Sequence, residues 1–134
     1  MSVQGACACG QVQYEVDEFF TPVIHCNCDT CRRVLGTPFN SVAGAKRAHF
    51  RVLAGQDKLK FFESSPGKSR YFCGECGTHL YGEKAGQENL IVRVGTLRDD
   101  PGIRGGMHIW TSHRKAWLGY EGLAEYAEWQ PGRV

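Results

Sequence analysis

Alternating apolar and polar residues predict short strands along most of this chain. Val12, Tyr14 and Val16 alternate with polar residues in segment 11–16, which is the period-two pattern of a half-buried strand. Similar short runs predict further strands at 39–44, 49–53, 59–62, 70–72, 78–81, 89–94 and 107–110. Turn residues separate them, as in Ser64–Ser69 (Ser-Ser-Pro-Gly-Lys-Ser). Many short strands with Gly- and Pro-rich turns indicate a mainly β domain rather than an alternating α/β one.

Helical signals are few. Segment 25–33 reads as a loop with a helical turn after Asp29, and the tail predicts two short helices at 114–118 and 123–128. Several aromatic side chains are expected in the core, namely Phe61, Phe62, Tyr71, Phe72 and Trp129.

The length of 134 residues, 42% of them hydrophobic, is enough for one domain with a core and too short for two comfortable ones. We expect a single domain over 1–134, with its core at about 3–120 and a tail at 121–134. No apolar run approaches the roughly 18 residues of a membrane span, and segment 1–8 lacks the features of a secretory signal. The expected location is therefore the cytoplasm.

Charge argues against a general polyanion binder. The formal net charge is +2, and the basic residues are spread along the chain instead of being massed in one run. Binding to nucleic acid is therefore not favoured.

The cysteines carry the strongest chemical signal. Their number is odd, and a reducing cytoplasm keeps thiols reduced, so metal binding is the better expectation than disulfides. They fall into three tight groups: Cys7 and Cys9; Cys26, Cys28 and Cys31; Cys73 and Cys76.

Two divisions of these thiols into zinc sites are open. The preferred one joins Cys7 and Cys9 to Cys73 and Cys76 in a closed structural site, because residues two apart in extended chain face the same side and Cys73-Gly-Glu-Cys76-Gly has the form of a zinc knuckle. The rival pairs Cys28 and Cys31 with Cys73 and Cys76, and it leaves three thiols unused.

In the preferred division Cys26, Cys28 and Cys31 form a site of their own. Three thiolates can hold Zn²⁺ and leave the fourth coordination position free for chemistry. The alternative is that His25 or another histidine closes the site and makes it structural.

Candidate substrate residues flank this cluster. Arg32 and Arg33 follow the third thiol and could bind carboxylates, or they could be a solvated pair. His108 is a pocket candidate because Trp110 and Trp117 could form an aromatic wall near it, whereas His113 is expected at the surface.

The cysteine motifs resemble those of the glutathione-dependent formaldehyde-activating enzyme family. The likeness rests on Gly5-x-Cys7-x-Cys9-Gly10, on Cys26-x-Cys28-x-x-Cys31-Arg32-Arg33, and on Phe72-Cys73-x-x-Cys76-Gly77-Thr78. Gly95-Thr96-Leu97 and His108-Ile109-Trp110 extend it toward the C-terminus.

The resemblance implies a zinc-stabilised all-β fold of several small coiled sheets, often called a β-tent. It also implies a structural zinc on Cys7, Cys9, Cys73 and Cys76, and a catalytic zinc on Cys26, Cys28 and Cys31. The implied reaction is that of a carbon–sulfur lyase, which joins formaldehyde to glutathione as S-hydroxymethylglutathione.

The leading hypothesis is therefore an enzyme with two zinc ions that acts on a small thiol such as glutathione and an aldehyde such as formaldehyde, with a homodimer as one possible oligomeric state. Alternatives are a family member that acts on a different thiol or electrophile, and a non-catalytic zinc domain that binds a protein or nucleic acid partner. A weaker alternative is redox sensing by the three-cysteine loop.

Overall fold

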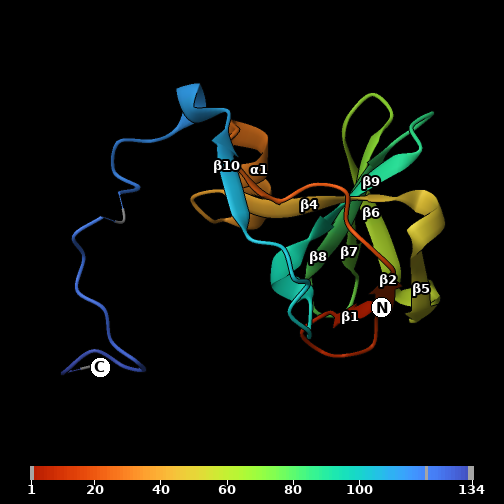
Figure 1. Ribbon diagram of the computed structural model, residues 1–134, viewed down its shortest axis with the longest axis horizontal. Coiled ribbons are helices and arrows are strands. Elements are labelled where there is room, and N and C mark those ends of the chain that lie inside the picture. The colour runs from red at the N-terminus through yellow and green to blue at the C-terminus, as the bar shows by residue number, and fades with distance from the viewer. Residues whose placement is uncertain (1, 120, 133–134) are drawn as a thin grey trace.

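The computed structural model describes residues 2–119 and 121–132 and is mainly β (Figure 1). Three strands form an antiparallel sheet in the order β1 (Val3–Ala6), β2 (Gln13–Val16), β5 (Phe50–Ala54). Seven form a second sheet in the order β10 (Gly105–Ile109), β3 (Val23–Cys26), β4 (Asn40–Lys46), β9 (Asn89–Arg93), β8 (His79–Lys84), β7 (Lys68–Cys73), β6 (Leu59–Ser65).

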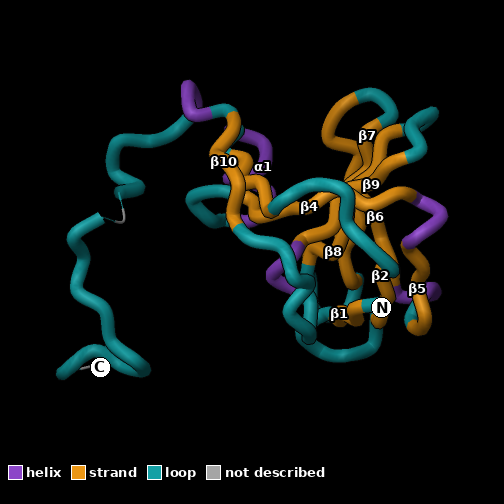
Figure 2. Tube along the Cα trace, in the orientation of Figure 1, coloured by secondary structure: helices purple, strands orange, loops and turns teal. Residues whose placement is uncertain are grey.

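Helices are few and short among the described residues (Figure 2). The α-helix α1 (Asp29–Leu35) follows β3 and ends at Gly36, which has the left-handed φ of 66° common at helix ends. Four 3₁₀ turns complete the set: η1 (Arg47–His49), η2 (Gln56–Lys58), η3 (Val94–Thr96) and η4 (Thr111–His113).

The predicted mainly β class is confirmed, and each segment predicted as a strand overlaps a strand of the structure. In β2 the side chains of Tyr14 and Val16 are buried while their neighbours are partly exposed, as period-two alternation requires. The predicted turn at 64–69 is narrower than expected, because β6 and β7 pair up to Ser65 and Lys68.

One strand was missed. No strand was predicted at 23–26, and its last two residues fell in the loop expected at 25–33, but β3 pairs with β4 on one side and with β10 on the other, and the β10 pairing is parallel. Its strand partners come from residues 40–42 and 105–109, so tertiary pairing decides its conformation rather than any local pattern.

The prediction of two helices in the tail was wrong. Segments 114–118 and 123–128 contain no helix, and Figure 1 shows the chain after η4 leading away from the sheets. Helices of five or six residues are marginal in water without a packed face, and Trp117 and Leu123 are mostly exposed.

The core lies where the small sheet packs on one face of the large one. It includes Val12, Tyr14, Val16, Ala45, Leu80, Leu90 and Val92. The Tyr14 hydroxyl lies 2.6 Å from the Thr96 Oγ1, so the most buried phenol still has a hydrogen-bond partner.

The expectation that five aromatic residues fill the core was only partly right. Tyr71 stacks on Tyr81, with ring centroids 4.6 Å apart. Phe61 and Phe62 are at least half exposed because they lie on β6, an edge strand, and Trp129 lies 68% exposed in the tail.

No helix within the described residues is long and apolar enough to cross a membrane.

The close approach of Gly5 to the core tyrosine generates a stability prediction. A Cβ at Gly5 would lie 2.3 Å from the Tyr14 ring carbon Cζ, and that ring is 1% exposed. We expect Gly5→Ala to lower the free energy of unfolding by about 1–3 kcal/mol, as for other overpacked sites. Urea denaturation of the metal-replete protein measures it.

Gly95→Ala is the matched control, since a Cβ there meets nothing within 4 Å. Equal unfolding free energies for the two variants would contradict the assigned contact.

Candidate metal centres and the adjoining cleft

The fold gathers the seven thiols into two clusters able to hold a metal ion. Within each cluster all the sulfurs lie within 4.8 Å of one another. One cluster consists of Cys7, Cys9, Cys73 and Cys76, and the other of Cys26, Cys28 and Cys31. This is the preferred division of the sequence analysis, and the rival pairing of Cys28 and Cys31 with the knuckle does not occur.

The four-cysteine cluster connects the two sheets. Cys7 follows β1 of the small sheet, and Cys73 ends β7 of the large one. The Cys9 sulfur lies 3.5 Å from that of Cys7 and 3.8 Å from that of Cys73. Tetrahedral zinc with bonds of about 2.3 Å places its sulfurs about 3.8 Å apart, so these spacings fit a metal.

The knuckle residues of this cluster have the local geometry that their sequence predicts. Gly77 has a φ of 79°, which is easily reached only by glycine, and its N–H donates to the Cys73 carbonyl at 2.8 Å. Hydrogen bonding with Thr78 is the main reason that the pKa of Cys76 is lowered to about 5, so this sulfur favours the thiolate form that metals bind.

The three-cysteine cluster forms where β3 passes into α1. Cys26 ends the strand, Cys28 caps the helix by accepting from the Cys31 N–H at 3.3 Å, and Cys31 lies in the first turn. The sulfurs of Cys26 and Cys31 are 3.6 Å apart. Three sulfurs at this spacing fit one tetrahedral metal ion and supply three of its four ligands.

His25 does not complete the cluster. Successive side chains of a strand face opposite sides, so the ring of His25 points away from the sulfur of Cys26. Its Nδ1 lies 2.9 Å from the Ser41 Oγ instead, and its ring packs against Phe39 and His108. Among the described residues no histidine or carboxylate joins the three sulfurs.

Two buried arginines, which the sequence analysis missed, accompany the three thiols. Arg70 and Arg93 are 6% and 5% exposed. Arg70 donates to the Cys31 sulfur at 3.6 Å and, through Nε, to the Ser64 Oγ at 2.8 Å. These cations offset the negative charge of thiolates, which burial alone would penalise.

Arg93 is the less satisfied of the two. Its Nε and one terminal nitrogen are buried without a hydrogen-bond partner among the described residues. Burial, followed by repulsion from Arg70, lowers the pKa of Arg93 to about 10, while the three thiols oppose that change. The guanidinium therefore stays charged at neutral pH, and its thiol neighbours help to keep it so.

The thiols themselves respond to this environment. Burial is the main reason that the pKa of Cys26 rises to about 12. Burial would also raise the pKa of Cys31, but hydrogen bonding to Cys28 and Arg70 outweighs it, and the net change is downward. Cys31 thus ionises more readily than Cys26.

An open hollow of about 580 Å³ adjoins this cluster. Cys28 lines it, together with Thr30, Ser64, Ser65, Lys68, Arg70, Lys84, Trp110 and His113. A ligand there would reach the sulfur side of the cluster from solvent. The volume lies in the range typical of small-molecule sites.

The wall opposite the helix is cationic. Lys68 and Lys84 are directly opposed on β7 and β8, and neither forms an ion pair with any described acidic residue. Burial and the nearby Arg70 lower the pKa of Lys68. Like charges placed opposite each other destabilise a sheet, so this pair suits a bound anion.

The two arginines predicted from the sequence lie on the helix side. Arg32 donates to the Asp29 carboxylate at 2.5 Å, within its own helix. Arg33 lines a second hollow of about 390 Å³ that shares Thr30 and Ser64 with the first. No hydrogen bond links either arginine to a sulfur, so the cation in contact with the thiols is Arg70.

The two substrate residues predicted at 108 and 110, one in β10 and one just after it, occupy different places. Trp110 lines the hollow beside Cys28 from a backbone with φ of 57°, a rare conformation for a large side chain. His108 packs on Phe39 and His25, outside that hollow, and lies 3.2 Å from the Asn27 amide. Asn27 is 1% exposed between two of the cysteines, so His108 reaches the cluster through it.

His113 was expected as a surface residue, but it lines the same hollow. Its Nδ1 accepts from the Asp29 N–H at 3.2 Å. A neutral ring that accepts at Nδ1 must carry its proton on Nε2. No local pattern marks this residue, because only the return of the chain after β10 brings it to the cysteines.

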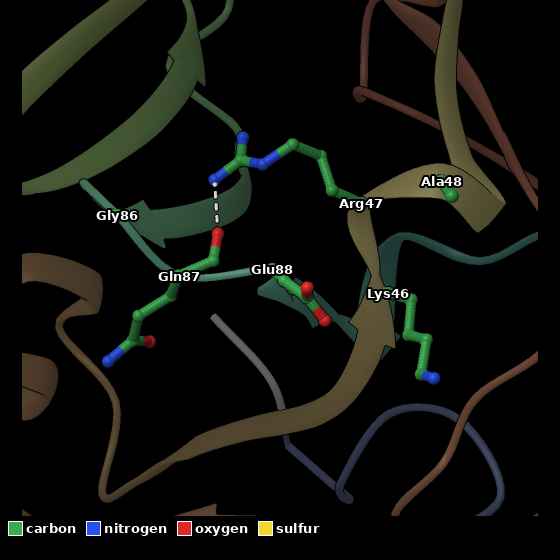
Figure 3. Close-up of a pocket in the computed structure, with 6 residues that line it drawn as sticks. All are labelled: Lys46, Arg47, Ala48, Gly86, Gln87 and Glu88. Atoms are coloured by element: carbon green, nitrogen blue, oxygen red, sulfur yellow. Dashed lines mark hydrogen bonds between the residues drawn. The ribbon is translucent and has the colours of Figure 1, made fainter.

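Another hollow of similar size lies elsewhere. It measures about 650 Å³ and is lined by Lys46, Arg47, Ala48, Gly86, Gln87 and Glu88 (Figure 3). Arg47 donates across it to the Gln87 carbonyl at 3.2 Å, and it contains no thiol. The thiols and cations therefore identify the hollow beside Cys28 as the candidate site.

Comparison with known proteins agrees with this geometry. The sequence model of the family described as "Glutathione-dependent formaldehyde-activating enzyme" matches residues 2–113, which end with η4. The chain belongs to this family.

Named relatives match only part of this chain, and the match spans about a third of their own length. Two proteins named "Putative glutathione-dependent formaldehyde-activating enzyme" are each 37% identical to it. The one from Aspergillus flavus matches over 57 residues, covering 42% of this chain and 30% of that protein. The one from Podospora anserina matches over 78 residues, covering 56% and 36%.

A crystal structure of a Rhodobacter sphaeroides protein shares the fold. It superposes with a TM-score of 0.62 at 27% sequence identity, and the match covers 76% of this chain and 97% of that one.

The two clusters predict different consequences of ligand loss. Cys73→Ser removes a buried ligand that joins the sheets, and we expect it to lose one equivalent of metal and several kcal/mol of stability, because metal binding is coupled to folding. Cys28→Ser is expected to lose the other equivalent and to retain the fold. Elemental analysis of the purified variants and urea denaturation measure both effects.

Each variant serves as the control for the other. Equal destabilisation of the two, or two full equivalents of metal in either, would argue against separate structural and reactive clusters.

Proposed function

We propose that both clusters hold zinc and that the chain catalyses carbon–sulfur bond formation between glutathione and formaldehyde. The three-cysteine cluster with its adjoining cationic hollow is the observation that carries this proposal. Family membership and the names of the relatives support the substrates. Zinc on three thiolates supplies a Lewis acid that polarises a carbonyl or lowers the pKa of a bound thiol.

The side chains around the hollow suit an anionic thiol. Lys68 and Lys84 would bind one carboxylate of glutathione, and Arg33, in the neighbouring hollow, would bind the other. Between these two anchors the thiol would lie beside Cys28. Arg32 has a supporting role, because it holds Asp29 at the start of the helix that carries the cysteines.

Trp110 and His108 complete the proposed site at different distances. Trp110 lines the hollow just after β10 and would contact a bound substrate there. His108 is a positioning residue, which contacts Asn27 and through it the loop between Cys26 and Cys28. Asn27 also donates to the His25 and Ile109 carbonyls, each at 3.1 Å, so this loop is bonded to both β3 and β10.

The reaction itself is an addition without net oxidation. The glutathione sulfur forms a bond to the formaldehyde carbon, the carbonyl π bond becomes a C–O single bond, and the thiol proton ends on the new hydroxyl group. His113 would stabilise the oxygen as it takes up negative charge, because its Nε2 holds a hydrogen to donate when Nδ1 accepts from Asp29.

The open hollow favours catalysis over a purely binding zinc domain, because a non-catalytic domain needs no space beside a three-thiolate cluster. A family member that uses another thiol or another electrophile remains the alternative.

The activity prediction is that the metal-replete protein accelerates formation of S-hydroxymethylglutathione, measured by exchange NMR. We expect Cys28→Ala to abolish the acceleration, because the variant loses a ligand at the open hollow. A wild-type rate no higher than that of Cys28→Ala would refute the reaction.

A second prediction concerns the anion anchor. Lys68→Ala and Lys84→Ala are each expected to raise the KM for glutathione by about tenfold or more, the effect of losing one charged hydrogen bond of about 1.5–3 kcal/mol. Lys60→Ala, on the exposed edge strand β6, is the matched control. An unchanged KM in both lysine variants would place the glutathione carboxylates elsewhere.

A further inference from the structure

An apolar hollow continues the cationic one. It measures about 240 Å³ and is lined in part by Phe20, Ile24, Val42, Ile91 and Ile109. Lys68 and Lys84 line it as well as the hollow beside Cys28, so the two are neighbouring parts of one cleft. The cleft therefore has a cationic end at the thiols and an apolar end over the large sheet.

The strand register places the apolar residues of this hollow next to the three-cysteine cluster. Ile24 and Cys26 are two residues apart in β3 and so face the same side of the sheet. Ile24 is paired with Val42 on β4, and Cys26 is paired with Ile109 on β10. The apolar residues thus begin next to the thiols instead of forming a separate patch.

A glycine allows the Phe20 ring to line this apolar hollow. A Cβ on Gly44 would lie 2.9 Å from the Phe20 ring, so the absence of a side chain there lets the ring lie close to the sheet. The ring remains 52% exposed, and Ile109 remains 37% exposed. Accessible apolar groups around a concave surface are typical of a site for an apolar ligand group.

We propose that, besides formaldehyde, the site accepts aldehydes with an apolar alkyl or aryl group, which the apolar end of the cleft binds. The inference rests on the proposed function, which places an anionic thiol at the cationic end. Formaldehyde has no carbon chain to fill the space over Ile24, Val42 and Ile91, whereas a larger aldehyde does.

The chemistry is the same addition. The thiol sulfur bonds to the aldehyde carbon, the carbonyl π bond becomes a single bond, and the thiol proton moves to the oxygen. The product is a hemithioacetal of the anionic thiol whose apolar group lies over the sheet. No oxidant or reductant is required.

Binding of stable product mimics tests the inference without turnover. Titration calorimetry on the metal-replete protein compares S-hexylglutathione with S-methylglutathione, which share every charged group. We expect the hexyl compound to bind at least about tenfold more tightly, because its additional methylenes leave water for the apolar cleft.

Two variants locate the preference. Ile91→Phe places a larger side chain in the apolar hollow. Phe20→Ala removes a lining ring that is half exposed, so Phe20→Ala is the safer of the two changes for folding. Both are expected to reduce the preference for the hexyl compound by about tenfold, while affinity for the methyl compound stays unchanged and so reports an intact fold. Leu53→Phe, on β5 of the small sheet, is the matched control and should retain the preference.

The outcomes separate this inference from the proposed function. Equal affinities for the two compounds, no binding of either, or a preference that persists in both variants would overturn the apolar assignment, even if formaldehyde addition is catalysed. A hexyl preference that both variants abolish would support it, even if exchange NMR finds no acceleration with formaldehyde.

Discussion

The convergence of Cys7 and Cys9 with Cys73 and Cys76 is the interaction on which the other features depend. It joins residues 64 positions apart, such as Cys9 and Cys73, and it ties the small sheet to the large one. Closing so long a loop is costly in entropy for a small β domain, and a metal ion bound by these four thiols would offset that cost. Because Cys73 ends β7, the same contact also fixes the position of that strand.

Strand β7 connects the two clusters. Arg70 and Lys68 lie on it three and five residues before Cys73, and Arg70 donates to the Cys31 sulfur of the other cluster. Residues an odd number of positions apart face opposite sides of a strand, so a single strand supplies a ligand to one site and cations to the other. A shift of β7 would therefore disturb both sites together.

Charge balance organises the second cluster. Three thiolates around a divalent metal leave a net negative charge in a largely buried place, and two nearly buried guanidiniums lie beside it. Arg70 is hydrogen-bonded to a sulfur, whereas Arg93 acts at longer range and has two nitrogens without a hydrogen-bond partner in the described part of the chain. Such unpaired buried groups are costly, and their persistence suits a site whose charge pattern serves a ligand rather than stability alone.

The period-two pattern and the cysteine spacing by themselves determined the strand-rich class and the three tight groups of cysteines, whose motifs carry the resemblance to the family. Those features are local: residues two apart in a strand and three apart in a helical turn meet whatever the rest of the chain does. Such local patterns could not predict contacts between residues that are far apart in the sequence. Cys31 meets Arg70 across 39 residues, and Asp29 meets His113 across 84.

Tertiary structure alone decided which cations face the thiols, that His25 points away from them, and that the hollow beside Cys28 continues into an apolar cleft. Each depends on the order and register of strands in the large sheet, since a shift of one residue turns every side chain of a strand to the other face.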